Sequence, residues 1–185
     1  TQAFDANGRL VVDGDGNGYR YDLRGKLLNV EGEGNTRYAY YPNELLASRA
    51  TQSSTVQMYY DNTQQVVNSY QNGVATQFLL VGSKRFATCK QGGTPLYYGT
   101  NQRQDTVLSM AGSKLVGSAS YQAYGAESDA NLGLDASNNF AWNQEYKDPD
   151  NKLVYLRARY YDPGTMRFIS RDNLRVDNRY GFGNG

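Results

Sequence analysis

The chain has 185 residues, with 19 basic and 18 acidic side chains and a formal net charge of +1, so it lacks the basic surface of a nucleic-acid-binding protein. It contains no histidine and a single cysteine, which excludes catalysis by Ser-His-Asp or Cys-His groups, histidine-ligated zinc sites and an internal disulfide. We expect no metal and no cofactor and, because no apolar run reaches about 18 residues, no membrane span.

A short unit, aromatic-Asp-x-x-Gly-x-Leu, recurs from the start of the chain. Residues 4–10 read Phe-Asp-Ala-Asn-Gly-Arg-Leu, and residues 21–27 read Tyr-Asp-Leu-Arg-Gly-Lys-Leu. Looser copies begin at Tyr41 and Tyr60, so the successive steps are 17, 20 and 19 residues, about one β-hairpin each. A fixed period of this size indicates a repeat architecture. The residues that carry the repeat motif are Phe4, Asp5, Gly8, Tyr21, Asp22, Gly25, Tyr60 and Asp61.

Each unit places an aromatic residue at the end of one strand, then a turn, then an aliphatic residue in the next strand. Aspartate accepts backbone hydrogen bonds in its own turn, and glycine adopts positive φ without steric cost. Around the turns, polar and apolar residues alternate with period two, which is typical of strands. The 17 tyrosines against 6 phenylalanines suit sheet faces that are partly wet. We therefore predict an all-β fold of stacked hairpins that forms a curved sheet or part of a hollow β-shell.

Residues 1–75 are predicted to be regular repeat hairpins. One of their loops, residues 13–18, copies the opening of an EF-hand calcium loop, but its twelfth position is Arg24 instead of glutamate and its flanks are strands. We interpret this loop as a polar hairpin connection. The expected strands are 9–12, 19–22, 26–30, 36–41, 45–50, 55–60 and 65–70.

Residues 76–185 are predicted to continue the same sheet as a second region in which the strict unit is lost. Residues 126–151 are polar, and we expect Phe140 and Trp142 to anchor this connection. The expected strands and hairpin before it are 78–81, 96–98 and 107–116.

The last region holds the densest pattern. Residues 153–163 read Leu-Val-Tyr-Leu-Arg-Ala-Arg-Tyr-Tyr-Asp-Pro, and residues 166–172 read Met-Arg-Phe-Ile-Ser-Arg-Asp. This pattern resembles the Rhs-associated core of the Rhs/YD-repeat proteins, and Tyr97-Tyr98-Gly99 through residue 125 resembles the preceding part of that core. The positions that carry the core motif are Tyr155, Arg157, Arg159, Tyr160, Tyr161, Asp162, Pro163, Arg167 and Phe168.

The resemblance implies a fold and a role. Repeats of this family wind into a hollow β-shell, the core plugs or lines one end, and a variable C-terminal toxin is held inside. Such proteins include the C components of bacterial Tc toxins and Rhs effectors of type VI secretion. The resemblance thus implies a toxin cargo, the remaining shell and a secretion or Tc B-type partner. It also implies a bacterial protein that is cytoplasmic before export and then secreted or injected.

In many members of the family the core also cuts its own chain once, by means of aspartates and an arginine. By motif position the equivalents are Arg171 and Asp172, and Asp162 and Asp177 are local candidates for the second carboxylate. Two carboxylates held close together share one proton, so one acts as acid and the other as base. The competing interpretation is that Asp162 and Asp172 cap turns and that the arginines form ion pairs. Met166 departs from the glycine that the family usually has before Arg-Phe.

The downstream cleavage motif of the family is absent from this sequence, and both ends read as cut, so we expect a piece of a longer product without a toxin. Arg157 and Arg159 are expected on one face of a single strand, either in cross-strand pairs or facing a cargo. About 18 strands rolled into one ring would leave a lumen of roughly 17 Å, which is room for an extended peptide at most.

Three functions follow from the sequence. The leading hypothesis is a non-catalytic shell segment that sequesters a toxin. The first alternative is a single-turnover aspartic autoprotease, and the second is a carbohydrate-binding module, because arrays of exposed tyrosines stack on sugar rings.

Overall fold

The computed structural model describes residues 1–32, 34–172 and 179–182, and in them the all-β prediction is confirmed. Fourteen strands form the first sheet, which we call the wall. They are β1 (Ala3–Phe4), β2 (Leu10–Val12), β3 (Gly18–Tyr21), β4 (Leu27–Glu31), β5 (Thr36–Tyr40), β6 (Leu46–Ala50), β7 (Thr55–Tyr60), β8 (Val66–Gln71), β9 (Val74–Val81), β10 (Lys84–Lys90), β11 (Leu96–Thr100), β12 (Thr106–Ala111), β13 (Lys114–Tyr121) and β14 (Glu127–Asn131).

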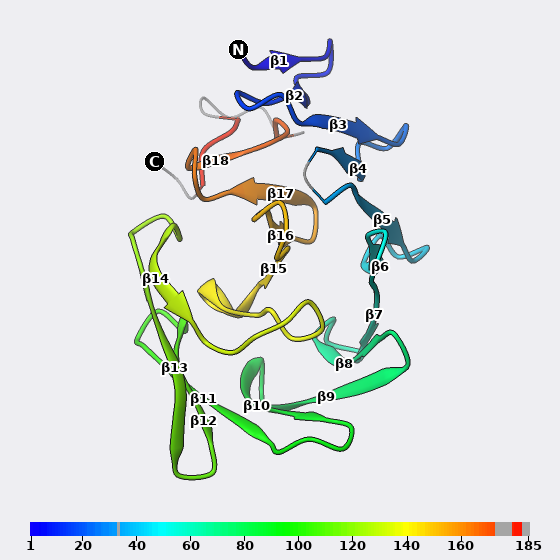
Figure 1. Ribbon diagram of the computed structural model, residues 1–185. Helices are drawn as coiled ribbons and strands as arrows, with labels where there is room; N and C mark the ends of the chain where they lie inside the picture. Colours follow the sequence, from blue (N-terminus) through cyan, green and yellow to red (C-terminus); the bar gives the residue numbers. More distant parts are fainter. Residues whose placement is uncertain (33, 173–178, 183–185) are drawn as a thin grey trace.

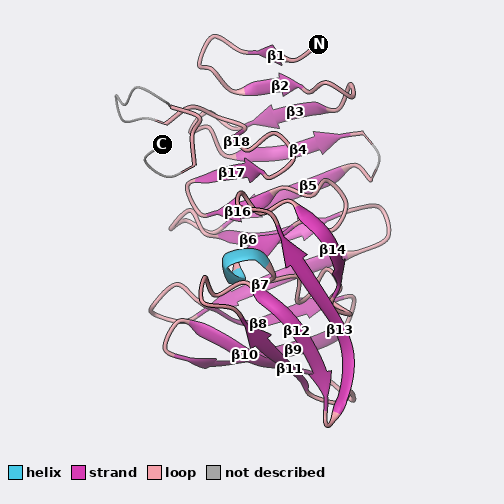
Figure 2. Ribbon diagram, turned by 90° about the vertical axis from the view of Figure 1, so that its left-hand side faces the viewer, coloured by secondary structure: helices cyan, strands magenta, loops and turns pink. Residues whose placement is uncertain are grey.

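The wall is an uninterrupted antiparallel meander in which each strand pairs with the strands before and after it in the sequence. It curves through β1–β8, turns at β9 and β10, and returns through β11–β14 (Figure 1). Figure 2 shows the first strands of this antiparallel sheet stacked one below another. A short 3-10 helix, η1 (Trp142–Gln144), follows the wall. The remaining strands are β15 (Tyr146–Lys147), β16 (Val154–Leu156), β17 (Arg159–Asp162) and β18 (Arg167–Phe168).

One five-residue turn recurs at the ends of the wall strands. The first residue donates its N–H to the carbonyl of the fifth, and the fourth donates its N–H to the carbonyl of the first. The fourth residue has positive φ, whether it is a glycine such as Gly25 (φ 85) or a residue such as Gln64 (φ 62). The seven copies are residues 5–9, 13–17, 22–26, 41–45, 61–65, 101–105 and 122–126.

A side-chain oxygen at the first position caps most of these turns. Asp22 Oδ1 accepts the N–H groups of Arg24 and Lys26 at 2.9 and 2.8 Å. The same pair of bonds is made by Asp5, Asp13, Asp61 and Asn101. The calcium-like loop is therefore one more repeat turn, as its interpretation as a polar hairpin connection predicts.

The third copy is displaced by one residue from the sequence alignment. Tyr41 occupies the aspartate position of its turn, and Tyr40 occupies the aromatic position, because Tyr40 pairs with Leu46 across the turn as Tyr21 pairs with Leu27. The prediction that Tyr41 carries the aromatic role was wrong, since the pairing register is set by the strands and not by the spacing of tyrosines.

The aromatic residues of successive repeats form a hydrogen-bonded ladder. The Tyr21 hydroxyl donates to the Leu10 carbonyl at 2.9 Å, Tyr40 to Leu27 at 2.6 Å and Tyr60 to Leu46 at 3.0 Å. Tyr121 repeats the contact in the second half of the wall, donating to Thr106 at 2.9 Å. The rings of Tyr21, Tyr40 and Tyr60 pack against the main core while their hydroxyls bind the preceding repeat, which explains why these positions hold tyrosine and not phenylalanine.

The concave face of the wall does not enclose an empty lumen. The strands β15–β18 form a separate four-stranded sheet that lies inside the curve of the wall (Figure 1). The strands therefore do not form the single ring on which the estimated lumen depends. Part of the reason is that residues 154–162 fold back as the hairpin β16–β17 with Arg157 in its turn (φ 57).

The same hairpin corrects the expected placement of the two motif arginines. Arg157 lies in the turn and Arg159 begins β17, so they do not share one face of a strand. Met166 has φ 58 in the turn before β18, a conformation that glycine adopts more readily than methionine. β14 was also not predicted, because residues 127–131 lie in a stretch that reads as a polar connection.

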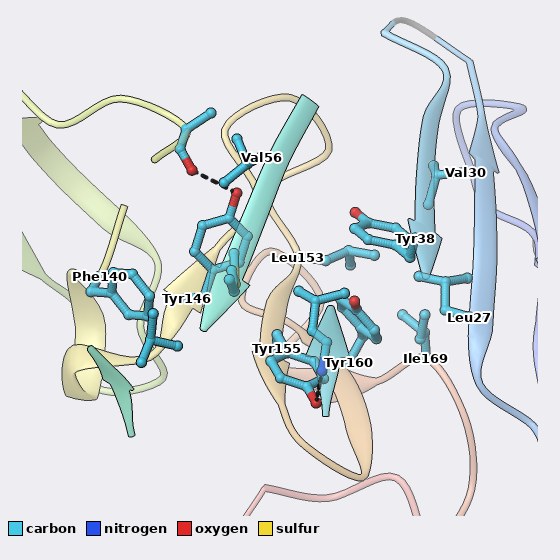
Figure 3. Packing of buried hydrophobic residues seen from close by; sticks show 14 of the residues in the cluster. Leu27, Val30, Tyr38, Val56, Phe140, Tyr146, Leu153, Tyr155, Tyr160 and Ile169 are labelled. Carbon is cyan, nitrogen blue, oxygen red and sulfur yellow. Dashed lines mark hydrogen bonds between the residues drawn. The ribbon is translucent and has the colours of Figure 1, made fainter. Parts of the chain in front are cut away.

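The main apolar core lies between the wall and the inner sheet (Figure 3). From the wall it takes Leu10, Tyr19, Leu27, Val30, Tyr38, Leu46, Val56, Met58, Val66 and Phe78. From the later residues it takes Ala136, Phe140, Tyr146, Leu153, Tyr155, Tyr160 and Ile169.

A second cluster covers the other face of the inner sheet. Neighbouring residues of β16 and β17 point to opposite faces, so Tyr155 and Tyr160 join the main core while Val154 and Tyr161 pack with Trp142. Trp142 stacks on Tyr161 with ring centres 5.4 Å apart. A side chain at Gly125 (φ 85) would place its Cβ 2.4 Å from Trp142, so this turn requires glycine for its space as well as its φ.

We predict that Tyr21→Phe lowers the free energy of unfolding by about 1–3 kcal/mol, because the Leu10 carbonyl loses its hydroxyl partner inside the protein. Urea unfolding of the variant and the parent measures the change. The control is Tyr59→Phe, whose exposed hydroxyl bonds only to the Gln57 side chain among the described contacts. Equal losses for the two variants would contradict the ladder.

We also predict that the turns weaken in acid. Burial tends to raise the pKa of Asp22, but hydrogen bonds from Lys26 and Arg24 outweigh it and lower this pKa; hydrogen bonds from Gln65 and Thr63 lower the pKa of Asp61. A folded pKa below the unfolded value gives stability that is present above about pH 4 and is lost as pH falls through the folded pKa.

The measurement is the thermal midpoint between about pH 5 and about pH 2. Asp22→Asn with Asp61→Asn should reduce the decline, because an amide oxygen caps this turn without titrating, as Asn101 does. Asp15→Asn is the control, since Asp15 offers its N–H, not its carboxylate, to the Asp13 cap. A decline that is the same in all three proteins would rule the turns out as its cause.

Candidate functional site

The candidate site is the contact between the wall and residues 132–172, which we call the inner segment. This contact contains buried charged and polar side chains. This segment leaves β14, passes through η1 and forms β15–β18 inside the wall (Figure 1). Apolar packing supplies most of the contact. Four groups of polar contacts fix its position.

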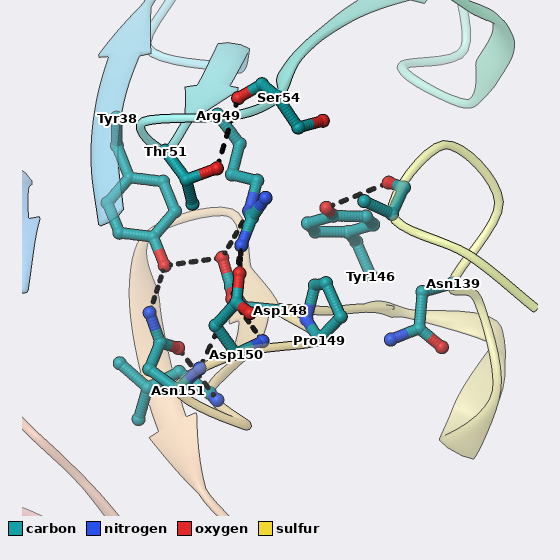
Figure 4. Close-up of polar contacts among 12 residues, drawn as sticks. Tyr38, Arg49, Thr51, Ser54, Asn139, Tyr146, Asp148, Pro149, Asp150 and Asn151 are labelled. Carbon is teal, nitrogen blue, oxygen red and sulfur yellow. Dashed lines mark hydrogen bonds and ion pairs between the residues drawn. The ribbon is translucent and has the colours of Figure 1, made fainter. Parts of the chain in front are cut away.

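The first group centres on a buried ion pair (Figure 4). Arg49 of β6 donates from Nε to Asp148 Oδ2 at 2.9 Å and from Nη2 to Asp148 Oδ1 at 3.2 Å. The two side chains are 2% and 1% exposed. Arg49 also pairs with Asp150, and the Tyr38 hydroxyl donates to Asp148 Oδ2 at 2.8 Å. This cluster joins two wall strands to the loop between β15 and β16.

Electrostatics keep this cluster in one charge state. Burial, followed by the negative charge of Asp148, raises the pKa of Tyr38 well above its ordinary value, so its hydroxyl stays protonated and donates. Burial alone would lower the pKa of Arg49, but the bond and charge of Asp148 raise it. A cavity of about 430 Å³ lies beside the ion pair, and its lining includes Arg49 and Asp150.

The second group is a reciprocal clamp between Gln144 of η1 and Arg85 of β10. The Arg85 N–H donates to Gln144 Oε1 at 2.7 Å, and Gln144 Nε2 donates to the Arg85 carbonyl at 2.8 Å. Arg85 Nη1 donates to the Gln144 carbonyl at 3.1 Å. Both polar ends of Gln144 are thereby satisfied inside the protein.

The third group holds the inner segment to the returning half of the wall. Asp105 Oδ1 accepts the N–H of Asn143 at 2.9 Å, and the Thr106 N–H donates to the Ala141 carbonyl at 2.9 Å. The Ser109 hydroxyl donates to the Leu132 carbonyl at 2.7 Å. The inner segment is thus bonded to both arms of the curved wall.

The fourth group closes the end of the inner segment against the first repeat. The Leu10 N–H donates to the Ile169 carbonyl at 2.8 Å, and the Arg171 N–H donates to the Gly8 carbonyl at 3.3 Å. The Tyr180 hydroxyl reaches the same Gly8 carbonyl at 2.8 Å. Residues separated by most of the chain length are therefore direct neighbours.

The residues of the predicted core motif all lie in or beside the hairpins of the inner sheet. Tyr155 accepts the Leu46 N–H at 3.0 Å, and Tyr161 donates to the Tyr124 carbonyl at 3.0 Å. Burial raises the pKa of Tyr155 to about 12 and that of Tyr161 to about 12. Arg157 pairs with Glu145 at 2.5 Å. Asp162 caps its own turn by accepting the Gly164 N–H at 2.8 Å, and Pro163, Arg167 and Phe168 complete that turn and β18.

The predicted catalytic pair lies at the end of the inner segment. Asp172 pairs with Arg159 at 2.7 Å, and its N–H donates to the Arg179 carbonyl at 2.8 Å. Arg171 and Asp172 help to line a cavity of about 370 Å³ together with Arg9 and Arg24. Asp177 lies outside the described residues.

The residues that fix the inner segment were not found from the sequence. Tyr38, Arg49, Arg85, Gln144 and Asp148 share no motif, and their partners are far apart in the chain. Arg49 lies within the expected strand 45–50, and its side chain is buried in β6. A charged residue in that place calls for a buried partner.

No family model and no curated protein matches the chain. Its fold matches solved structures of toxin complexes. One is the crystal structure of TcdB2-TccC3-TEV, with a TM-score of 0.69 and 16% identity over 96% of this chain and 10% of that chain. Another is the Tc holotoxin pore of Photorhabdus luminescens, with a TM-score of 0.70 and 15% identity over the same shares.

A third is TcdB2-TccC3 without its hypervariable C-terminal region, with a TM-score of 0.70 and 16% identity over 96% of this chain and 10% of that chain. At this identity the likeness shows the fold alone, and the chain spans about a tenth of the length of the chains it matches. In the described residues, no helix has the length and apolar character needed to cross a membrane.

We predict that Asp148→Asn lowers the free energy of unfolding by about 3–5 kcal/mol, because it leaves the Arg49 charge buried without its main partner. Adding Arg49→Met should recover much of the loss, since it removes the unpaired charge. The control, Arg20→Met, breaks an exposed ion pair with Glu31 and should cost no more than about 1 kcal/mol. Chemical unfolding measures all three. A double variant as unstable as Asp148→Asn alone would contradict this account.

Proposed function

We propose that this chain is a structural segment of an Rhs-like toxin shell, and that the inner segment closes the shell at this point. The observation that carries the proposal is the pairing of an uninterrupted repeat wall with a segment of the same chain that fills its concave face. The fold shared with the solved toxin complexes supports it.

The construction of the wall suits a shell. Each hairpin pairs only with its neighbours, so such a sheet can be lengthened by adding repeats without changing those already present. The ladder is made between adjacent repeats and the caps within single turns, so neither needs a partner from outside. The proposed function is mechanical: the wall encloses a cargo and keeps other molecules away from it, and this requires no reactive group.

The filled concave face limits where the proposed cargo would lie. Residues of the inner segment occupy that face along most of the wall, so a sequestered toxin would be held in space enclosed by further repeats. In this arrangement the inner segment closes the compartment. A Tc B-type protein or a secretion apparatus as partner, and export or injection from a bacterial cell, are part of the same proposal. The titles of the matched structures, which name TcdB2-TccC3 assemblies, support the B-type partner.

We propose that the chain as described is not an enzyme. In the described residues Asp172 forms an ion pair with Arg159 at 2.7 Å, and Asp162, the other described candidate carboxylate, caps its own turn. Intact-mass measurement over days at about pH 5–8, the range around neutrality in which folded proteins are usually most stable, should show a single uncut species. A fragment that disappears with Asp172→Asn would establish the autoprotease instead.

Protease protection tests the shell function. In the full gene product that contains this sequence, residues encoded downstream should resist digestion as long as the inner segment closes the wall. Asp148→Asn, which removes the main partner of Arg49, should make them digestible, while Arg20→Met, which alters only an exposed pair, should leave them protected. Downstream residues that are digested equally fast in the parent and in both variants would remove sequestration as the function.

A further inference from the structure

One row of side chains on the wall is apolar although a sheet face in contact with water ordinarily carries polar residues. The strand register places Ala87 of β10 opposite both Leu79 of β9 and Tyr97 of β11. Tyr97 lies opposite Met110 of β12, and Met110 lies opposite Leu115 of β13. Because side chains directly opposite one another on neighbouring strands are within contact range, these five residues form one continuous row, which we call the apolar row.

The apolar row lies on the face of the wall that is turned away from the inner segment. Ser109, between Leu108 and Met110 on β12, is buried and donates its hydroxyl to a carbonyl of the inner segment at 2.7 Å. Successive side chains of a strand point to opposite faces, so Leu108 and Met110 face outward. The exposed fractions on this face are 46% for Tyr97, 37% for Met110, 56% for Leu115 and 40% for Leu108.

The outward face of the first half of the wall is polar by comparison. There, Asn29 of β4 lies opposite both Arg20 of β3 and Arg37 of β5, and Gln57 of β7 lies opposite Ser48 of β6. The apolar row is therefore a local feature of β9–β13 and does not follow from the repeat. Contiguous exposed apolar residues on a folded protein mark a surface that contacts another molecule.

The strands that carry the apolar row have a surplus of positive charge. Residues 74–121 contain five basic side chains and one acidic side chain, and this acid, Asp105, is 2% exposed. Lys84 and Lys114 are exposed at the first positions of β10 and β13, and the ion pairs recorded for the described residues include neither of them. A molecule that covers the apolar row therefore meets exposed cations at its edges and no exposed carboxylate from these strands.

We propose that the apolar row is a docking surface for a polypeptide segment that is apolar where it touches the row and acidic beside it. Protein interfaces have centres rich in aromatic residues and methionine, and polar rims; here Tyr97 and Met110 form the centre, and Lys84 and Lys114 lie at the rim. The positive charge selects an acidic partner over a basic one. A second copy docked through the same face would bring the same positive charge to the contact, which disfavours self-association.

Fluorescence anisotropy with labelled synthetic peptides and the whole chain tests the chemistry of this partner. Three peptides of equal length are compared, which alternate leucine with glutamate, leucine with lysine, or serine with glutamate. In an extended peptide alternate residues lie on one side, so the first peptide presents an apolar side together with acidic groups. It should bind the chain, and the other two should bind about tenfold more weakly or less well still.

Two double variants identify the residues responsible. Met110→Ser with Leu115→Ser should weaken binding of the leucine–glutamate peptide by about tenfold or more. Lys84→Glu with Lys114→Glu should shift the preference toward the leucine–lysine peptide. The matched control is Leu28→Ser, which removes an exposed leucine from β4 in the first half of the wall and should bind as the parent does. Thermal midpoints close to that of the parent establish that each variant is folded.

Four results would overturn the proposal. The first two are a leucine–glutamate peptide that does not bind, or that binds no better than the leucine–lysine peptide. The third is binding that Met110→Ser with Leu115→Ser leaves unchanged. The fourth is a different occupant: dimerisation in sedimentation that this double variant abolishes would assign the apolar row to a second copy, and binding to phosphatidylserine vesicles without binding of the acidic peptide would assign it to a membrane surface.

Discussion

A curved sheet of hairpins has an apolar concave face that its own strands cannot cover, and the rest of this structure depends on how that face is buried. Each wall strand pairs only with its neighbours in the sequence, so the sheet grows by adding strands at its edge and no wall strand pairs across the concave face. Burial of apolar area is the main force that stabilises a fold. The inner segment provides it, bringing rings such as Tyr155 and Tyr160 against Tyr38 and Leu46.

Burying that face brings polar groups inside as well, and each must find a partner there. Arg49 meets Asp148, Gln144 meets the backbone of Arg85, and the repeat tyrosines meet the carbonyls of the preceding repeat. These contacts are directional, whereas apolar packing is not. They determine the position of the inner segment within the wall. Apolar packing alone would allow several positions, and the directional contacts select one of them.

The same arrangement accounts for the proposed role. A wall of repeats that is closed by a segment of its own chain needs a fixed shape and stability. The described residues that sequence motifs suggested as catalytic instead make contacts that stabilise this shape. Asp172 is held by Arg159, and Asp162 caps a turn. Arg85, a buried arginine without an ion pair in the described part of the chain, also lies at the contact between the wall and the inner segment.

The sequence by itself determined the all-β class, several of the repeat turns and most of the wall strands, because these depend on contacts within about 20 residues: an aspartate and its turn, or two neighbouring strands. It did not determine that residues 153–163 form a hairpin, that Tyr40 and not Tyr41 carries the third repeat, or that Arg49 meets Asp148. The hairpin and the third repeat depend on the pairing register of neighbouring strands, which residue spacing alone does not give. The Arg49–Asp148 pair joins segments about 100 residues apart, and only the closing of the inner segment against the wall brings them together.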